Sequence, residues 1–491
     1  MIDDIPLPLL DRRLARAVFA LREARRALDR GDPEALASHR RSPLDAHRQT
    51  SSLDSFTALA PPPPIERPPE ALGLPPGEAP PPIVVDDPLR AAMRVWVGAL
   101  TLERVLWADR VRIARALRAE SVRIDESDLG RIAISPREAL HRLLTERDGD
   151  LGAIYARALE RGASPVADAA RIFAERRAEA ARRLGEGFDL DALEIPLDRD
   201  RKGDRDRKGD RGRDPKDALA ALAADLLRRT EPLLRPAGER WSDSITASLA
   251  RDAGEGWPAR LNARWIEELF HTTRLTEGLR LALPALPAAI GASSFARALA
   301  AFGAALADED GPRDRPFAIA HAPFDLRRTR RAALFGMLVA DPVFHRRALG
   351  LGRDRARAQA RTIARALLRG LRLDAARAEL RGALLDPART RAQRFEERTA
   401  EALLGVPIPP ALAGVLPALG PEDPARLLGV LLAAADRRQL IESFDEDWFV
   451  SPHAAAAIRD EDSSGARALP ATASEAEAGL GALCRALEDL G

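Results

Sequence analysis

The sequence predicts an all-α protein, a multi-helix bundle of about 15 helices. Helix starts are the first reason: Asp-Pro or Ser-Pro, an N-cap followed by proline at the first helical position, precedes apolar-periodic runs at 87, 135, 164, 341, 423 and 451. Periodicity is the second, as in Ile363, Leu367 and Leu371. The third is the scarcity of strand signals, since the runs at 83–85 and 132–134 are too short and isolated to predict a sheet.

The chain begins with an N-terminal helical segment, expected over 1–59, and continues into a proline-rich linker over 60–87. Eleven prolines fall between residues 61 and 82. Proline donates no backbone hydrogen bond, so this run predicts a semi-rigid extended segment. The PxxP spacing at 61–64 leaves two interpretations open, a spacer or a ligand motif for an SH3-type domain.

A helical subdomain is expected over 88–196, where Met93, Val97 and Leu100 recur at helical spacing. A charged repeat follows over 197–217, in which one hexapeptide occurs twice and which holds all three lysines of the chain. The repeat has no apolar residue after Leu197 that could be buried. We therefore expect it to be disordered.

The remaining chain predicts a helical main domain over 218–465 and a C-terminal helix within 466–491. Thr472 and Glu475 have the spacing of a capping box at the start of that last helix. Trp448 and Phe449 stand beside three carboxylates in a chain with few aromatic residues, and we expect them to anchor their segment on the core.

Composition narrows the class of protein. The chain has 491 residues, 46% apolar, with 73 Arg, three Lys and a net charge of +1. The arginine excess follows GC-rich codon usage and is balanced by acidic residues, so it does not favour a nucleic-acid partner. A single cysteine, Cys484, excludes a disulfide scaffold. The acidic start and the lack of a long apolar run predict a cytoplasmic protein with no membrane partner.

One pentapeptide, Glu267 to His271, resembles the HExxH motif of zinc peptidases. In that motif two histidines one turn apart bind the metal and the glutamate acts as general base. Here Glu268 and His271 match, but Glu267 replaces the first histidine, and no Asp or Glu follows between 278 and 307 as a third ligand. The alternatives are a helical protein that binds a divalent metal such as zinc or iron, and an inactive relative of an HExxH metallopeptidase.

A second ExxH spacing, Glu138 to His141, would combine with Glu268 and His271 in a di-iron bundle site. Two such motifs are unremarkable in a chain of this composition. Ser135 and Glu138 also have capping-box spacing, which explains the glutamate without a metal.

An arginine stripe follows one face of the helix predicted over 354–381, since spacings of three and four residues share a face. It is a candidate anion-binding surface, with nucleic acid as one ligand class; no aromatic residue interleaves it to stack bases. Acidic residues over 442–462 are its expected internal partner. The stripe comprises Arg353, Arg357, Arg361, Arg365, Arg369 and Arg372.

The sequence assigns no catalytic residue and no cofactor, because neither a nucleophile elbow nor a glycine-rich phosphate loop is present. It predicts a non-enzymatic interaction or structural protein. The metal-binding protein centred on Glu267, Glu268 and His271 is the first alternative, and the anion-binding arginine stripe is the second. The sequence is compatible with a protein partner, and it does not determine the oligomeric state.

Overall fold

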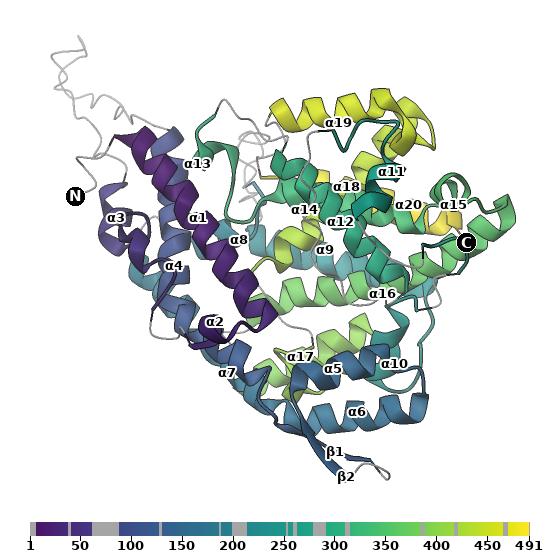
Figure 1. Ribbon diagram of the computed structural model, residues 1–491, viewed down its shortest axis with the longest axis horizontal. Helices are drawn as coiled ribbons and strands as arrows, with labels where there is room; N and C mark the ends of the chain where they lie inside the picture. Colours follow the sequence, from purple (N-terminus) through teal and green to yellow (C-terminus); the bar gives the residue numbers. More distant parts are fainter. Residues whose placement is uncertain are drawn as a thin grey trace, which may run out of the picture. The chain divides into compact units, whose positions relative to one another are not determined.

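The computed structural model describes most of the chain, and all structural statements here concern that part (Figure 1). Most of the predicted linker at 60–87 and of the charged repeat at 197–217 lies outside the described residues. The described ranges are 6–37, 41–60, 88–126, 130–185, 188–198, 214–251, 254–258, 263–277, 291–309, 315–383, 388–416, 421–464 and 470–490.

The prediction of an all-α bundle is confirmed, since the described residues form twenty α-helices, sixteen of them seven residues or longer. The first ten are α1 (Leu7–Arg30), α2 (Pro33–Ala37), α3 (Leu53–Ala58), α4 (Pro88–Ala116), α5 (Pro136–Thr145), α6 (Gly149–Gly162), α7 (Ser164–Leu184), α8 (Leu190–Glu194), α9 (Pro215–Thr230) and α10 (Trp241–Ala247). The others are α11 (Ala263–Leu269), α12 (Ala292–Glu309), α13 (Phe317–Ala320), α14 (Leu326–Gly336), α15 (Pro342–Ala348), α16 (Arg353–Ala383), α17 (Ala388–Ala402), α18 (Asp423–Phe444), α19 (Pro452–Ser464) and α20 (Ala473–Leu490).

The chain divides into two compact units. Unit 1 comprises 1–111, 176–190 and 314–323, and unit 2 comprises 112–175, 191–313 and 324–491. The domain boundaries expected from the sequence stay predictions.

Two features of α1 stabilise unit 1: its buried apolar face and a carboxylate that caps α13. Leu10, Leu14 and Leu21 of α1 are buried at helical spacing. Asp11, on the same face, accepts hydrogen bonds of 2.8 Å from the backbone N–H groups of Phe317 and Ala318. These are unpaired donors at the first turn of α13, so a buried carboxylate binds this short helix to α1.

Glu103 of α4 is the central buried charge of unit 1. Its carboxylate lies 2.7 Å from the guanidinium nitrogens of both Arg25 and Arg110. Burial alone would raise the pKa of the Glu103 carboxyl, but the two arginine charges outweigh burial and hold this pKa well below its usual range. Glu103 is therefore a buried anion that joins α1 to α4.

Unit 2 contains a hairpin, which corrects the expectation that residues 132–134 are too isolated for a sheet. Strands β1 (Val122–Glu126) and β2 (Gly130–Ile134) pair antiparallel, with Val122 opposite Ile134. Val122, Ile124 and Ile134 point into the core, as the period of two along a strand requires. The missing signal was the partner strand, whose alternating Val and Ile are separated by charged residues.

Four helices of unit 2, α12, α14, α18 and α20, pack in that order. Glycines allow the closest approaches. A Cβ at Gly303 would overlap the carbonyl oxygen of Arg331, and one at Gly479 would overlap that of Leu431. Only glycine lets two helix backbones approach this closely.

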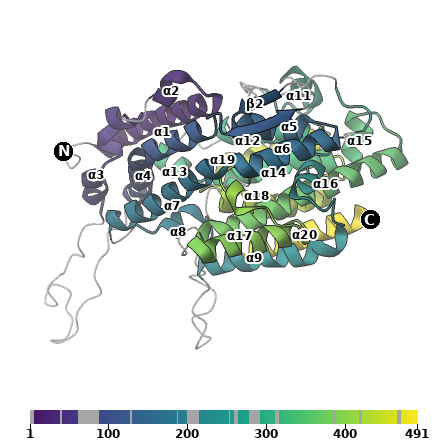
Figure 2. The ribbon, with the colours of Figure 1, turned by 90° about the horizontal axis from the view of Figure 1, so that it is seen from below.

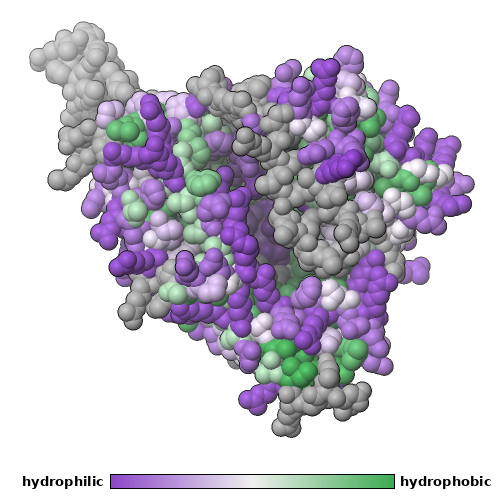
Figure 3. Space-filling view, viewed as in Figure 1, coloured by the Kyte–Doolittle hydropathy of each residue, from purple (hydrophilic) through white to green (hydrophobic). Residues whose placement is uncertain are grey.

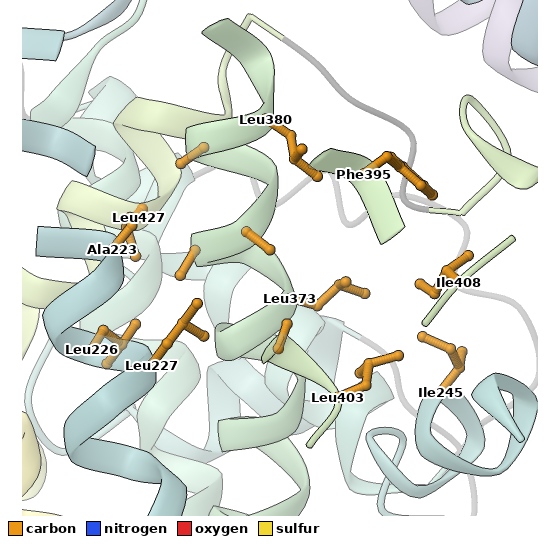
Figure 4. Packing of buried hydrophobic residues seen from close by; sticks show 14 of the residues in the cluster. Ala223, Leu226, Leu227, Ile245, Leu373, Leu380, Phe395, Leu403, Ile408 and Leu427 are labelled. Atoms are coloured by element: carbon orange, nitrogen blue, oxygen red, sulfur yellow. The ribbon is translucent and has the colours of Figure 1, made fainter. Parts of the chain in front are cut away.

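The long helix α16 connects the two hydrophobic clusters of unit 2. Ile363 and Ala366 belong to one cluster, whereas Leu373 and Leu380 belong to the other. Figure 4 shows Leu373 and Leu380 between α9 and the segment that carries Leu403. Figure 2 shows α20 running beside α9, in agreement with their contacts.

Several caps follow the sequence prediction. Thr472 and Glu475 form the complete capping box at α20, with hydrogen bonds of 2.8 and 3.1 Å. Asp341 caps α15 through the backbone N–H groups of Val343 and Phe344. Trp448 and Phe449 are fully buried, as expected of an anchor.

No described helix combines the length and the apolar character that crossing a bilayer requires. On the face shown in Figure 3, hydrophilic side chains cover most of the described surface, in keeping with a charged content of 31%.

Candidate functional site: an arginine-lined groove

A groove with a volume of about 1320 Å³ lies within unit 2. Its described lining comes from α12, α14, α15, α16, α18 and α20. The groove follows α16 from Arg353 to Arg377. Residues of α16 belong to both hydrophobic clusters of unit 2, so this wall of the groove is fixed by the core.

The groove has apolar walls and a basic rim. Half-buried Ala333, Leu367 and Ile441 continue one hydrophobic cluster, and half-buried Leu371 continues the other. Ten of the described lining residues are arginines and five are Asp or Glu. The excess of positive charge beside apolar surface favours an anionic ligand with apolar groups.

Part of this charge is already paired within the groove. Arg437 lies 2.6 Å from Asp341, and Arg438 lies 2.7 Å from Glu442. Arg377 lies 3.1 Å from Asp374 and also pairs with Asp423. Burial raises the pKa of the Asp374 carboxyl, while Arg377 and Arg426 oppose that rise. These pairs fix the geometry of the rim.

Five lining arginines form no side-chain hydrogen bond or ion pair with any described residue. They come from five helices and are exposed, so their guanidinium groups can bind an incoming anion without breaking a hydrogen bond or an ion pair to the described residues. They are Arg297, Arg346, Arg353, Arg426 and Arg485.

The predicted arginine stripe divides into residues of the groove and residues that stabilise the fold. Arg353 and Arg357 line the groove, and Arg365 is exposed outside its described lining. Arg361 donates to the carbonyl oxygen of Leu490 at 2.6 Å, and Arg369 donates to that of Arg235 at 2.7 Å.

Arg372 is the fully buried member of the stripe. It donates to the carbonyls of Leu227, Ala402 and Glu401 and to the hydroxyl of Thr230. These acceptors lie at the last turns of α9 and α17, so Arg372 joins the ends of the two helices. Backbone carbonyls are thus the main internal partners of the stripe, in place of the expected acidic segment at 442–462.

The acidic segment does pair with a neighbouring arginine. Asp447 lies 2.7 Å from Arg347, which belongs to the basic stretch before α16. The acidic segment therefore pairs with an arginine of α15, the helix that precedes α16.

The candidate metal ligands Glu267, Glu268 and His271 lie around the end of α11. The helix ends at Leu269, so His271 follows it in a turn, and all three side chains are exposed. Glu268 lies 2.9 Å from Arg264. None of the three is among the described residues that line the groove, and the described residues hold no group of three metal-ligating side chains. The metal site stays a prediction.

Glu138 of the second ExxH motif, Glu138 to His141, forms hydrogen bonds within its own helix α5 and with the residue that caps it. Ser135 caps α5 by accepting a hydrogen bond of 3.1 Å from the N–H of Glu138, as predicted. The Glu138 carboxylate accepts a hydrogen bond of 2.7 Å from Arg142, rather than reaching back to the cap. Arginine one turn away thus neutralises this glutamate.

Sequence reasoning missed the groove residues outside α16. Arg297 and Arg485 are single exposed arginines on amphipathic helices, and Arg426 is an exposed arginine on the largely buried α18. No local sequence pattern distinguishes any of the three. Only the packing of α12, α18 and α20 places them on one rim.

The chain has the fold of a known peptidase structure. No protein-family model and no curated protein sequence matches it. Among solved structures, that of Pyrococcus furiosus carboxypeptidase in an apo-Mg form is similar, with a TM-score of 0.52 and 12% identity. The match covers 98% of this chain and 97% of that chain. At this identity the similarity shows the fold alone.

Proposed function

We propose that this chain is a non-catalytic binding protein with a carboxypeptidase-like fold, whose arginine-lined groove binds an acidic ligand. One observation carries the proposal: five exposed arginines from five helices line one apolar-walled groove, and their side chains form no hydrogen bond or ion pair with the described residues. An arginine rim beside apolar walls attracts carboxylates and excludes cations.

The region around α11 supports the non-catalytic part of the proposal. A zincin pair needs two histidines one helical turn apart. Here Glu267 takes one position, and α11 ends two residues before His271. Glu268, the residue at the position of the general base, lies 2.9 Å from Arg264.

Binding of fluorescent poly-L-glutamate tests the groove. We expect the double variant Arg353→Glu/Arg426→Glu to bind at least about tenfold more weakly than the natural chain, because two attractive charges become repulsive. Binding by the natural chain should also weaken with added salt, since the contacts are solvent-exposed. Fluorescence anisotropy gives both affinities.

The double variant Arg365→Glu/Arg394→Glu is the matched control. It carries the same change of net charge at exposed positions outside the described groove lining. The control should bind polyglutamate nearly as well as the natural chain. Equal losses in both variants, or no binding at all by the natural chain, would overturn the proposal.

A metal-binding or inactive peptidase-like protein is the second candidate. It is favoured by the likeness to a carboxypeptidase along nearly the whole chain and by the Glu268 and His271 pair. Glutamate and histidine side chains are common ligands of zinc. In this candidate, Glu267, Glu268 and His271 would hold the ion.

Equilibrium dialysis against zinc tests this candidate. Binding near one ion per chain that His271→Ala abolishes would support it. A content below about 0.1 ion per chain, unchanged by His271→Ala, would exclude it, because a real site requires its ligands.

A further inference from the structure

We infer that the ligand of the groove is an extended acidic peptide segment of about ten residues, in which acidic and apolar side chains alternate. This inference rests on the proposed function and specifies its ligand. The length, wall chemistry and charge distribution of the groove carry it.

The groove is as long as a short extended peptide. Its lining follows α16 from Arg353 to Arg377, a rise of about 36 Å at 1.5 Å per residue. An extended chain covers that span with about ten or eleven residues at 3.3–3.6 Å each. The volume of 1320 Å³ also exceeds the usual range of about 300–1000 Å³ for small-molecule pockets.

The apolar walls of the groove favour a peptide that has apolar side chains on one side. Ala296, Ala300 and Ala333 are small and half-buried, and Leu367 and Leu371 continue the hydrophobic clusters into the groove. Successive side chains of an extended peptide point to opposite sides. One set would therefore contact the apolar wall while the other reached the arginines at the rim.

The charges are spread along the groove rather than gathered at one end. Of the arginines without an ion pair, Arg353 stands at one end of the α16 wall. Arg426 of α18 acts on the carboxyl of Asp374, which lies near the other end of that wall. A lipid or small acid with a single anionic group would use only one of these positions. A chain with a carboxylate at every second residue would use several.

The absence of aromatic side chains favours a peptide over a nucleic acid. Phe, Tyr, Trp and His are missing from the described groove lining. Proteins that bind single-stranded nucleic acid stack its bases on aromatic rings. Apolar side chains of a peptide need no such platform.

A peptide series tests the inference, with affinities measured by fluorescence anisotropy. The probes are a ten-residue Glu-Ala repeat, a ten-residue Glu-Ser repeat with equal charge, a four-residue Glu-Ala repeat and a ten-nucleotide oligothymidine. We expect the ten-residue Glu-Ala peptide to bind at least about tenfold more tightly than each of the other three. Arg353→Glu/Arg426→Glu should remove most of that binding.

Equal affinity for the Glu-Ala and Glu-Ser repeats, or for the long and short repeats, would overturn the inference. Tighter binding of oligothymidine through the same arginines would overturn it too. If polyglutamate binds the groove but the series shows no such preference, only the inference fails. If polyglutamate does not bind, the proposed function fails with it.

Discussion

Replacing Arg372 with alanine is expected to lower the free energy of unfolding by about 3–5 kcal/mol. Arg372 is 1% exposed and donates to four acceptors at the ends of α9 and α17. Removing the guanidinium takes away the side-chain donor to the carbonyl of Ala402, and an unpaired buried group of this kind costs about 1–3 kcal/mol. It also opens a cavity and removes one of the donors to the carbonyls of Leu227 and Glu401.

Urea denaturation measures this loss, and Arg353→Ala is the control. Arg353 lies on the same helix, is exposed and forms no side-chain hydrogen bond or ion pair with the described residues, so its loss should change stability by less than about 0.5 kcal/mol. Similar stability in the two variants would show that Arg372 does not hold these helix ends.

Acidification is expected to destabilise unit 1 through Glu103. Burial would raise the pKa of this carboxyl, but Arg110 and Arg25 hold it well below the unfolded value of about 4.3. A depressed folded pKa stabilises the fold fully above the unfolded pKa. That stabilisation is lost as the pH falls below about 4 and then through the folded pKa.

Glu103→Gln should remove this pH dependence. The variant should also lose about 3–5 kcal/mol at pH 7, because it leaves two arginines facing each other without a carboxylate. Urea denaturation followed by tryptophan fluorescence between pH 7 and pH 3 measures both effects. A variant as stable as the natural chain at pH 7 would contradict the buried ion cluster.

Local sequence signals predicted the helices and their caps. Thr472 and Glu475 form the capping box that their spacing requires, because the contact involves one turn of chain. The hairpin was missed because Ile132 to Ile134 needs a partner strand, and Val122 to Glu126 carries a weak alternation. Strand pairing is not encoded within a single segment.

For the arginine stripe, the local sequence predicted the helix but not which of its arginines are buried. Helical periodicity correctly placed Arg353 and Arg372 on one long helix, α16. It could not separate the exposed Arg353 from the buried Arg372, because Arg372 donates to the carbonyls of Leu227 and Ala402, which lie 145 and 30 positions away in the sequence. The groove likewise depends on contacts between helices that are distant in the chain.

The affinity of Arg353→Glu/Arg426→Glu for polyglutamate, compared with that of Arg365→Glu/Arg394→Glu, tests the assignment of the groove most directly. If the groove binds acidic ligands, the first variant loses at least about tenfold in affinity and the second binds almost normally. Equal affinities in the two variants would show that ligand contacts lie elsewhere on the chain.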